Sequence, residues 1–171
     1  EKKMDAPGEV PDIFEVHDFM PRYRHAGRGN DYFTAPELIR YIRRISGAPV
    51  FRVHYEPALV YGKRRTETEQ HPGYIKSWST GGSYESVYLY SSLCFDDIFE
   101  GRAITLFKDE FMEVSYHQKV FAQTMDRTYL KMQKTKAYWR DWVDRNSDTE
   151  YCNDAVVRSA LVLKLMTFQP T

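Results

Sequence analysis

The chain has 171 residues, of which 42% are hydrophobic, 28% are charged and 15% are aromatic, a composition typical of a globular protein that favours β-structure or a sugar-binding surface. Its formal net charge is +0, with 24 basic and 24 acidic residues, which argues against a nucleic-acid-binding protein. Cys94 and Cys152 are too few for a disulfide framework, so we expect buried or idle thiols and a cytoplasmic protein.

The first 123 residues show the pattern of an antiparallel β-protein. Six short runs combine strand-type composition with alternation of apolar and polar residues: 12–20, 38–45, 50–56, 84–93, 103–107 and 111–116. Helical spacing also fits residues 38–45, but the Ser-Gly-Ala-Pro connection that follows favours a hairpin with residues 50–56. Since no helical pattern separates the runs, we predict an α+β, mainly β, fold with an antiparallel β-sandwich over residues 1–123.

The segments between these runs carry turn residues and charges. Residues 1–10 and 22–37 are rich in Gly, Pro, Asn, Asp and charged residues, and we predict loops there. Residues 62–82 are similar, with candidate short-strand residues at Tyr74, Ile75 and Trp78. The mixed charges of residues 63–69, KRRTETE, predict a solvated loop.

Helical spacing begins after about residue 124 and predicts a linker helix over residues 124–147. Asp126 near its start and Arg140 and Arg145 near its end suit the helix dipole, and Asn146–Asp148 would break the helix. Four residues three and four positions apart form its apolar stripe: Met132, Thr135, Trp139 and Trp142.

A further helix, expected within residues 148–171, is apolar on almost every side. Residues 155–166 include only Arg158, Ser159 and Lys164 as polar positions, and such a helix is normally enclosed by others. The run is too short and too charged to favour a membrane span. We therefore expect a chain that stops as an α-helical domain begins, with an exposed and self-associating helix. The side chains expected to be exposed are Val156, Leu161, Leu163 and Leu165.

The histidines show no metal-ligand spacing. His17 and Asp18 are neighbours on a predicted strand and so point to opposite faces, which argues against a shared metal site. The others are expected on strands beside polar partners or in loops, where a structural or surface histidine is the commoner interpretation: His54, His117, His25 and His71. We predict no metal ligand and no cofactor.

Catalytic motifs are also missing from the sequence. There is no CxxC, HExxH, GxSxG, Walker or dinucleotide fingerprint, and Cys94 has no base near it in sequence. An acid–base pair needs a defined gap between two groups, whereas the carboxylates are scattered over predicted turns. These include Asp96, Asp97, Asp109 and Glu110. We predict no catalytic residue within the chain.

Tyr84, Tyr88 and Tyr90 share one face of the predicted strand over residues 84–93. Flat aromatic rings pack well against the apolar faces of sugar rings, so this face could bind a sugar. An inter-sheet core or a protein interface explains the same pattern more often. Both interpretations remain open.

The helical end resembles a known family. Residues 128–145, TYLKMQKTKAYWRDWVDR, and 156–171, VVRSALVLKLMTFQPT, resemble the linker and first barrel helix of glycoside hydrolase family 15, which contains prokaryotic glucoamylases and related trehalases. The most specific parts are the W-x-x-W pair of Trp139 and Trp142 and the RSAL-x-LK motif from Arg158 to Lys164.

The upstream part of the chain is similar to the same family. The runs FEVHDFMPRY, LIRYIRRISG and V-x-Y-x-P-x-x-x-Y-G, the last over residues 53–62, resemble later strands of its N-terminal β-supersandwich domain.

The resemblance implies an inverting α-glucosidic hydrolase, in which one glutamic acid protonates the leaving oxygen and a second activates water. Both glutamates are expected on the barrel, outside this chain, while Arg158 and Lys164 are expected to be structural. The chain would then be an inactive middle portion: late sandwich strands (1–123), linker helix (124–147) and first barrel helix (148–171), packed against a missing barrel. Its oligosaccharide substrate, reached through the full-length protein, stays open among maltooligosaccharides, dextran-type glucans and trehalose.

The alternative from another functional class is a stand-alone carbohydrate-binding or interaction β-module. The tyrosine-rich strands allow it, whereas the apolar last helix argues against a finished domain.

Overall fold

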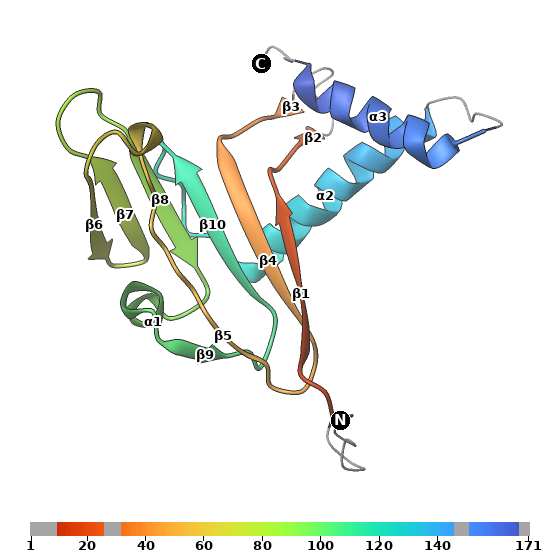
Figure 1. The fold of residues 1–171 in the computed structure, drawn as a ribbon. Helices are drawn as coiled ribbons and strands as arrows, with labels where there is room; N and C mark the ends of the chain where they lie inside the picture. Colours follow the sequence, from red (N-terminus) through yellow and green to blue (C-terminus); the bar gives the residue numbers. More distant parts are fainter. Residues whose placement is uncertain (1–9, 26–31, 146–150, 168–171) are drawn as a thin grey trace, which may run out of the picture. The chain divides into compact units, whose positions relative to one another are not determined.

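A computed structural model describes residues 10–25, 32–145 and 151–167 (Figure 1). The chain forms two compact units, one of Glu1–Met20 with Pro36–Tyr129 and one of Pro21–Ala35 with Leu130–Thr171. The predicted helix break at Asn146–Asp148 lies outside the described residues, as do most of the predicted loop at residues 1–10 and the middle of the one at residues 22–37.

The first unit is built on a six-stranded antiparallel sheet with the strand order β1-β4-β10-β8-β7-β6. In this order the strands are β1 (Ile13–Phe19), β4 (Glu37–Ser46), β10 (Glu110–Tyr116), β8 (Ser86–Ser91), β7 (Tyr74–Ser79) and β6 (Thr66–His71). The strand runs of the sequence therefore become paired strands. One apolar face carries Ile42, Ile75 and Leu89, and Ile39, Tyr41 and Phe111 are also buried on the other face.

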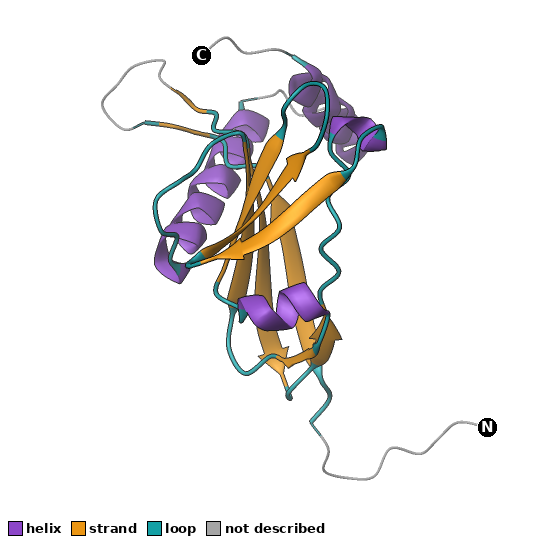
Figure 2. Cartoon of the chain, turned by 90° about the vertical axis from the view of Figure 1, so that its left-hand side faces the viewer, coloured by secondary structure: helices purple, strands orange, loops and turns teal. Residues whose placement is uncertain are grey.

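A second layer covers part of that apolar face. Strands β5 (Val50–Arg52) and β9 (Ala103–Thr105) form an antiparallel ribbon, with the short helix α1 (Phe95–Glu100) near it (Figure 2). The core joins side chains of the two layers: Ile42, Ile75 and Leu89 from the sheet, with Val53, Leu93, Ile98, Ile104 and Leu106. The expected α+β, mainly β, sandwich is confirmed.

The predicted hairpin between residues 38–45 and 50–56 is wrong. Strand β4 pairs with β1 on one side and β10 on the other, while β5 pairs with β9. Gly47, with a φ of +65°, lets the chain turn out of the sheet after β4. Phe51 and Val53 then join the core from the second layer. The alternation of buried residues along this segment is as predicted, whereas its partner strand is not.

Two further local predictions are wrong. The sequence predicts no helix among the strands, yet α1 forms there and ends at Gly101, which has a left-handed φ of +64°. Residues 63–69 are predicted as a solvated loop, but Thr66–His71 form the edge strand β6, paired with β7. The charged residues of β6 obscured the strand pattern in the sequence. Charged side chains are common on edge strands, where they protect against unwanted pairing with other chains.

The second unit holds a small ribbon and two helices. The ribbon pairs β2 (Tyr23–Arg24) with β3 (Tyr32–Phe33), within a segment predicted to be only a loop. Helix α2 (Met125–Asp144), which starts in the first unit, confirms that a helix forms within residues 124–147, and its role as a linker stays a prediction. Along its predicted stripe Met132 and Thr135 are buried, while Trp139 and Trp142 are half-buried.

Helix α3 (Asn153–Met166) confirms the predicted last helix and has no buried residue. Val156, Leu163 and Leu165 are exposed, as expected, whereas Leu161 is half-buried. Self-association through these side chains stays a prediction. In the part of the chain that the structure describes, no helix is both long and apolar enough to span a membrane.

Candidate functional site

A groove of about 530 Å³ opens on the apolar face of the sheet, between β1 and β4 on one side and the segment around β5 on the other. Its walls are mostly aliphatic and aromatic, with a few polar groups. Fourteen residues line it: Phe14, Val16, Asp18, Leu38, Arg40, Ile42, Phe51, Arg52, Val53, His54, Tyr55, Leu89, Met112 and Val114. An apolar groove with few polar groups is the usual form of a ligand site, so this is the first place to look for chemistry.

The sheet side of the groove carries one ion pair. Asp18 and Arg40 are partners across the β1–β4 ladder, and the Arg40 guanidinium donates from Nε to Oδ1 at 2.8 Å and from Nη2 to Oδ2 at 2.7 Å. The hydrogen bond from Arg40 holds the pKa of the Asp18 carboxyl below its usual value. Asp18 therefore stays ionised and fully engaged by its partner.

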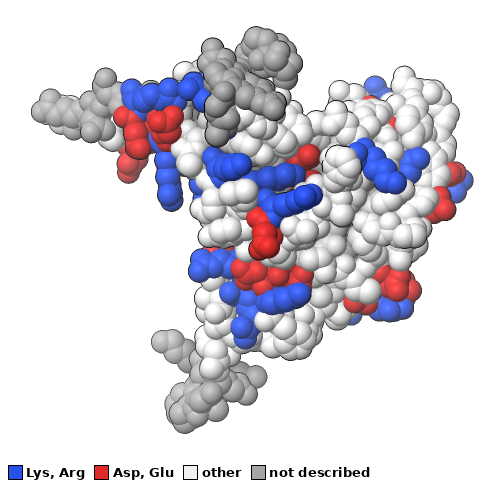
Figure 3. Space-filling model, turned by 180° about the vertical axis from the view of Figure 1, so that it is seen from behind, with Lys and Arg blue, Asp and Glu red and all other residues white. Residues whose placement is uncertain are grey.

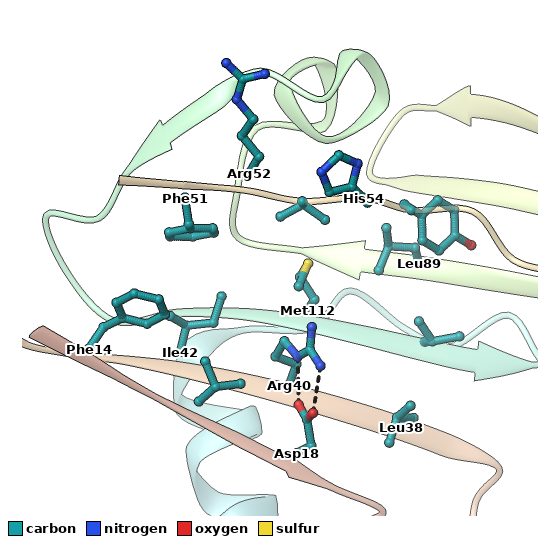
Figure 4. Close-up of a pocket in the computed structure, with 14 residues that line it drawn as sticks. Phe14, Asp18, Leu38, Arg40, Ile42, Phe51, Arg52, His54, Leu89 and Met112 are labelled. Carbon is teal, nitrogen blue, oxygen red and sulfur yellow. Dashed lines mark hydrogen bonds and ion pairs between the residues drawn. The ribbon is translucent and has the colours of Figure 1, made fainter. Parts of the chain in front are cut away.

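The opposite side of the groove carries Arg52 and His54, which come from the β5 segment and face away from the ion pair (Figure 4). His54 lies just past β5 and is exposed, so its predicted place on a strand is wrong. Neither residue forms a hydrogen bond or an ion pair with the Asp18 carboxylate, and the two polar sides of the groove remain separate.

This groove lacks the pair of carboxyl groups that a glycosidase uses. Hydrolysis of a glycosidic bond needs two carboxyl groups on either side of the bond, one of them protonated. Asp18 is the one carboxylate among the fourteen lining residues, and Arg40 keeps it charged. The groove is suited to binding an apolar group, not to acid–base catalysis.

We expect the Asp18–Arg40 pair to add only about 0.2–1 kcal/mol to stability at neutral pH, because both side chains are about half exposed (49% and 50%). A double-mutant cycle with Asp18→Asn and Arg40→Leu, read from urea unfolding, measures this coupling. The folded pKa of Asp18 is lowered, so the coupling is present above the unfolded pKa of about 3.9 and is lost as the pH falls through the folded pKa. A coupling unchanged at pH 2 would contradict this assignment.

The opposite face of the sheet is aromatic along β7 and β8. The rings of Tyr74 and Tyr88 have centroids 5.8 Å apart, and Lys76 Nζ lies 6.0 Å from the centre of the Tyr88 ring. Tyr90 is buried, and its hydroxyl accepts the Val120 N–H at 3.1 Å. Tyr88 and Tyr90 share a face as predicted, and the core interpretation applies to Tyr90.

Tyr84 differs from these two tyrosines. It precedes β8 instead of belonging to it, and 56% of its side chain is exposed. The hydrogen bond from Lys76 lowers the pKa of Tyr84. Of the three predicted tyrosines, Tyr84 is the one whose ring is most available to a ligand.

The remaining histidines are structural or surface residues. His71 ends β6 instead of lying in a loop, and it stacks on Tyr74 with ring centroids 5.0 Å apart. His17 lies 3.3 Å from Glu15 on the face opposite Asp18, and His25 packs edge-on against Tyr23 and Phe33. His117 follows β10. Within residues 10–25, 32–145 and 151–167, no group of three or more His, Cys, Asp or Glu could hold a metal ion.

The predicted carboxylates do not come together as a catalytic pair. Asp109 accepts the Tyr41 hydroxyl at 2.8 Å and the Arg44 N–H at 2.9 Å, which gives it a structural role. Burial, and then Asp109, raise the pKa of Tyr41. Asp96 and Asp97 lie on α1 with Gln70 and Arg102 as their partners, and Glu110 is a buried residue of β10.

Both cysteines are free and exposed, so of the two expected states, buried or idle thiols, burial is wrong and the idle thiol stays a prediction. Cys94 directly precedes α1 and Cys152 directly precedes α3, and neither helix has a side-chain cap from its cysteine.

Charges of both signs lie interspersed on the face drawn in Figure 3.

Two curated proteins are similar to the chain over almost its whole length. A trehalase of Thermoplasma volcanium is 28% identical over 165 residues, which cover 93% of this chain and 25% of that protein. A trehalase of Thermoplasma acidophilum is 25% identical over 162 residues, which cover 93% of this chain and 27% of that protein. The chain thus spans about a quarter of the length of the curated relatives it matches. No family model and no solved structure gives a significant match.

These similarities support a distant relationship of the chain to trehalases.

Proposed function

We propose that the chain is a non-catalytic N-terminal portion of a trehalase-like, inverting glycoside hydrolase. The observation that carries the proposal is the similarity of 93% of the chain to a quarter of two trehalases. In the proposed parent, two glutamates on an α/α barrel outside this chain perform the acid and base steps. The parent would be a cytoplasmic family 15 enzyme, glucoamylase-like or trehalase-like, acting on the glucosidic bonds of oligosaccharides.

The structure supports this proposal in two ways. First, the groove holds a single carboxylate, ionised and paired with Arg40, where catalysis would need two carboxyl groups. Second, the residues of the RSAL-x-LK motif, Arg158 to Lys164, lie on a helix whose apolar side chains are exposed. In the proposal these side chains pack against the barrel, and burying them there removes apolar surface from water.

The test compares the 171-residue chain with the longer polypeptide that carries it. Each is incubated with trehalose and with maltose, and the released glucose is followed by ¹H NMR, which also reports its anomeric form. We expect no glucose from the 171-residue chain. From trehalose, the longer polypeptide should release one α- and one β-glucose per bond cleaved, as inversion requires.

Hydrolysis by the 171-residue chain alone would contradict the non-catalytic role, and two α-glucose products would contradict inversion. Binding of sugars by the 171-residue chain, with no hydrolysis by the longer polypeptide, would favour a stand-alone carbohydrate-binding module instead. The intact mass of each sample is measured first. It should be 20.2 kDa for the 171-residue chain and larger for the longer polypeptide.

A further inference from the structure

Three consecutive residues adopt a left-handed backbone before the edge of the sheet. Val60, Tyr61 and Gly62, the residues of the short 3-10 segment η1, have φ values of 52°, 55° and 71°. Only glycine takes this conformation without strain, because a Cβ comes too close to the following carbonyl oxygen. A β-branched residue and a bulky residue in succession there are exceptional.

The surrounding structure holds this strained turn in place. The Val60 N–H donates to Glu85 Oε2 at 2.6 Å, and the Gly62 N–H donates to the Leu59 carbonyl at 3.0 Å. Leu59 itself is buried and anchors the turn. Tyr61, in contrast, is 94% exposed and adds nothing to the core. The strained backbone positions an exposed aromatic side chain that does not stabilise the fold. This points to a role of Tyr61 other than in folding.

Glu85 connects Tyr61 to a second exposed tyrosine. Tyr116, the last residue of β10, is 40% exposed. Glu85 accepts the Val60 N–H, and the carbonyl of the next residue, Ser86, accepts the N–H of His117, which follows Tyr116. Desolvation and the carboxylate of Glu85 raise the pKa of Tyr116, and Tyr61 adds to this effect. Glu85 and Ser86 therefore connect the turn that carries Tyr61 with the end of β10, which carries Tyr116.

A second left-handed residue brings in the third tyrosine. His117 has a φ of 57°, and its N–H donates to the Ser86 carbonyl at 2.8 Å. Its ring lies 4.2 Å from that of Tyr116 and 6.4 Å from that of Tyr84, between centroids. We call Tyr61, Tyr84 and Tyr116, with Glu85, the tyrosine cluster. Figure 1 shows its location, where η1 lies beside the end of β10 and the start of β8.

The surroundings of the cluster are polar. In residues 57–66, 80–86 and 115–119, the exposed large apolar side chains are the three tyrosines alone. The other exposed residues in these ranges are mostly glycine, serine, lysine, arginine and glutamine, with Ala58 and His117. Tyrosine rings among polar groups offer apolar faces for stacking and hydroxyl groups for hydrogen bonding on one surface.

We propose that the tyrosine cluster is a binding surface for a glucosyl ring of an α-linked glucoside. The sugar class rests on the proposed function, whereas the surface itself rests on the geometry. The ring hydroxyls of glucose are mostly equatorial, so its C–H bonds form flat apolar faces that stack on phenol rings. Its hydroxyls can donate to the Glu85 carboxylate and exchange hydrogen bonds with the tyrosine hydroxyls and Lys76.

The test is a titration of the 171-residue chain, followed by NMR or calorimetry, with trehalose and with maltotriose. Sorbitol, which has similar hydroxyls and no ring, is the ligand control. We expect binding of both sugars or of one of them, and the two arms distinguish a disaccharide site from an oligosaccharide site. Tyr61→Ala and Tyr84→Ala should each weaken binding at least fivefold, while Tyr151→Ala, an exposed tyrosine outside the cluster, should leave it unchanged.

A further variant, Tyr61→Gly, separates function from structure. It removes the ring and also relieves the strain, so we expect weaker sugar binding together with a higher midpoint of thermal unfolding. A purely structural Tyr61 would give a lower midpoint. That result, or sugar binding unaffected by Tyr61→Ala and Tyr84→Ala, or no binding of either sugar, would overturn the proposal.

The readout is binding and not hydrolysis, so the two proposals fail separately. Glucose release by the longer polypeptide with no sugar bound by the 171-residue chain would reject the cluster and leave the proposed function standing. Sugar binding that Tyr61→Ala abolishes, with no hydrolysis by the longer polypeptide, would support the cluster and reject the proposed function.

Discussion

Replacing Leu106 by alanine is expected to lower the free energy of unfolding by about 2–5 kcal/mol. Leu106 is fully buried (0% exposed) and lies in the core between the sheet and the second layer. Its N–H donates to the Pro49 carbonyl at 2.9 Å, so the backbone is fixed and has little freedom to fill the cavity that alanine leaves. Urea unfolding followed by circular dichroism measures the change.

The adjacent residue supplies the control for this prediction. Phe107 is 74% exposed, so Phe107→Ala should change the free energy of unfolding by no more than about 0.5 kcal/mol although it removes a larger side chain. Equal losses for the two variants would mean that the second layer is not packed on the sheet as described.

Replacing Gly47 by alanine is expected to lower the free energy of unfolding by about 2–4 kcal/mol, from a left-handed backbone and an overpacked contact together. Gly47 has a φ of +65°, and an added Cβ would lie 2.9 Å from Asp12 Cα and 3.0 Å from the Pro11 carbonyl oxygen, besides meeting Asp12 Oδ1. These are mostly backbone atoms, held by the Ser46 hydroxyl, which donates to the Pro11 carbonyl at 2.6 Å. Urea unfolding of the variant again gives the value.

Gly73 separates the two contributions. It also has a positive φ, +86°, but a Cβ there would meet no atom within 4 Å. Gly73→Ala should therefore lose only the backbone part, about 1 kcal/mol. If both variants lost the same amount, the close approach of residue 47 to the segment before β1 would be incorrect.

Most strands were predictable from the sequence because burial on one face of a sheet leaves a period of two. The alternation around Leu89 and around Phe51 identifies their strands and their buried faces correctly. It carries no information on which strand lies alongside, since a strand alternates in the same way against any neighbour. This is why residues 50–56 were predicted to pair with β4, when β5 pairs with β9 more than fifty residues later.

The two candidate surfaces were harder to predict. Asp18 and Arg40 become partners only through the β1–β4 register, which the sequence does not display. The strained turn at Val60–Gly62 was missed because its sole local signal is Gly62, and nothing about Val60 or Tyr61 suggests a left-handed backbone. What places these residues is the contact with Glu85, twenty-five positions away.

The place of β10 in the sheet has a consequence for how the protein folds. It is the last strand in the sequence, yet it lies between β4 and β8 and forms hydrogen bonds with both. Until it is inserted, β1–β4 and β6–β7–β8 are two separate sheets, with Ile42 and Leu89 of the core on different pieces. Such late, non-local pairing is slow, typically milliseconds to seconds. During synthesis, the edges of β4 and β8 therefore stay open until residues 110–116 leave the ribosome, and in that interval they can pair with other chains.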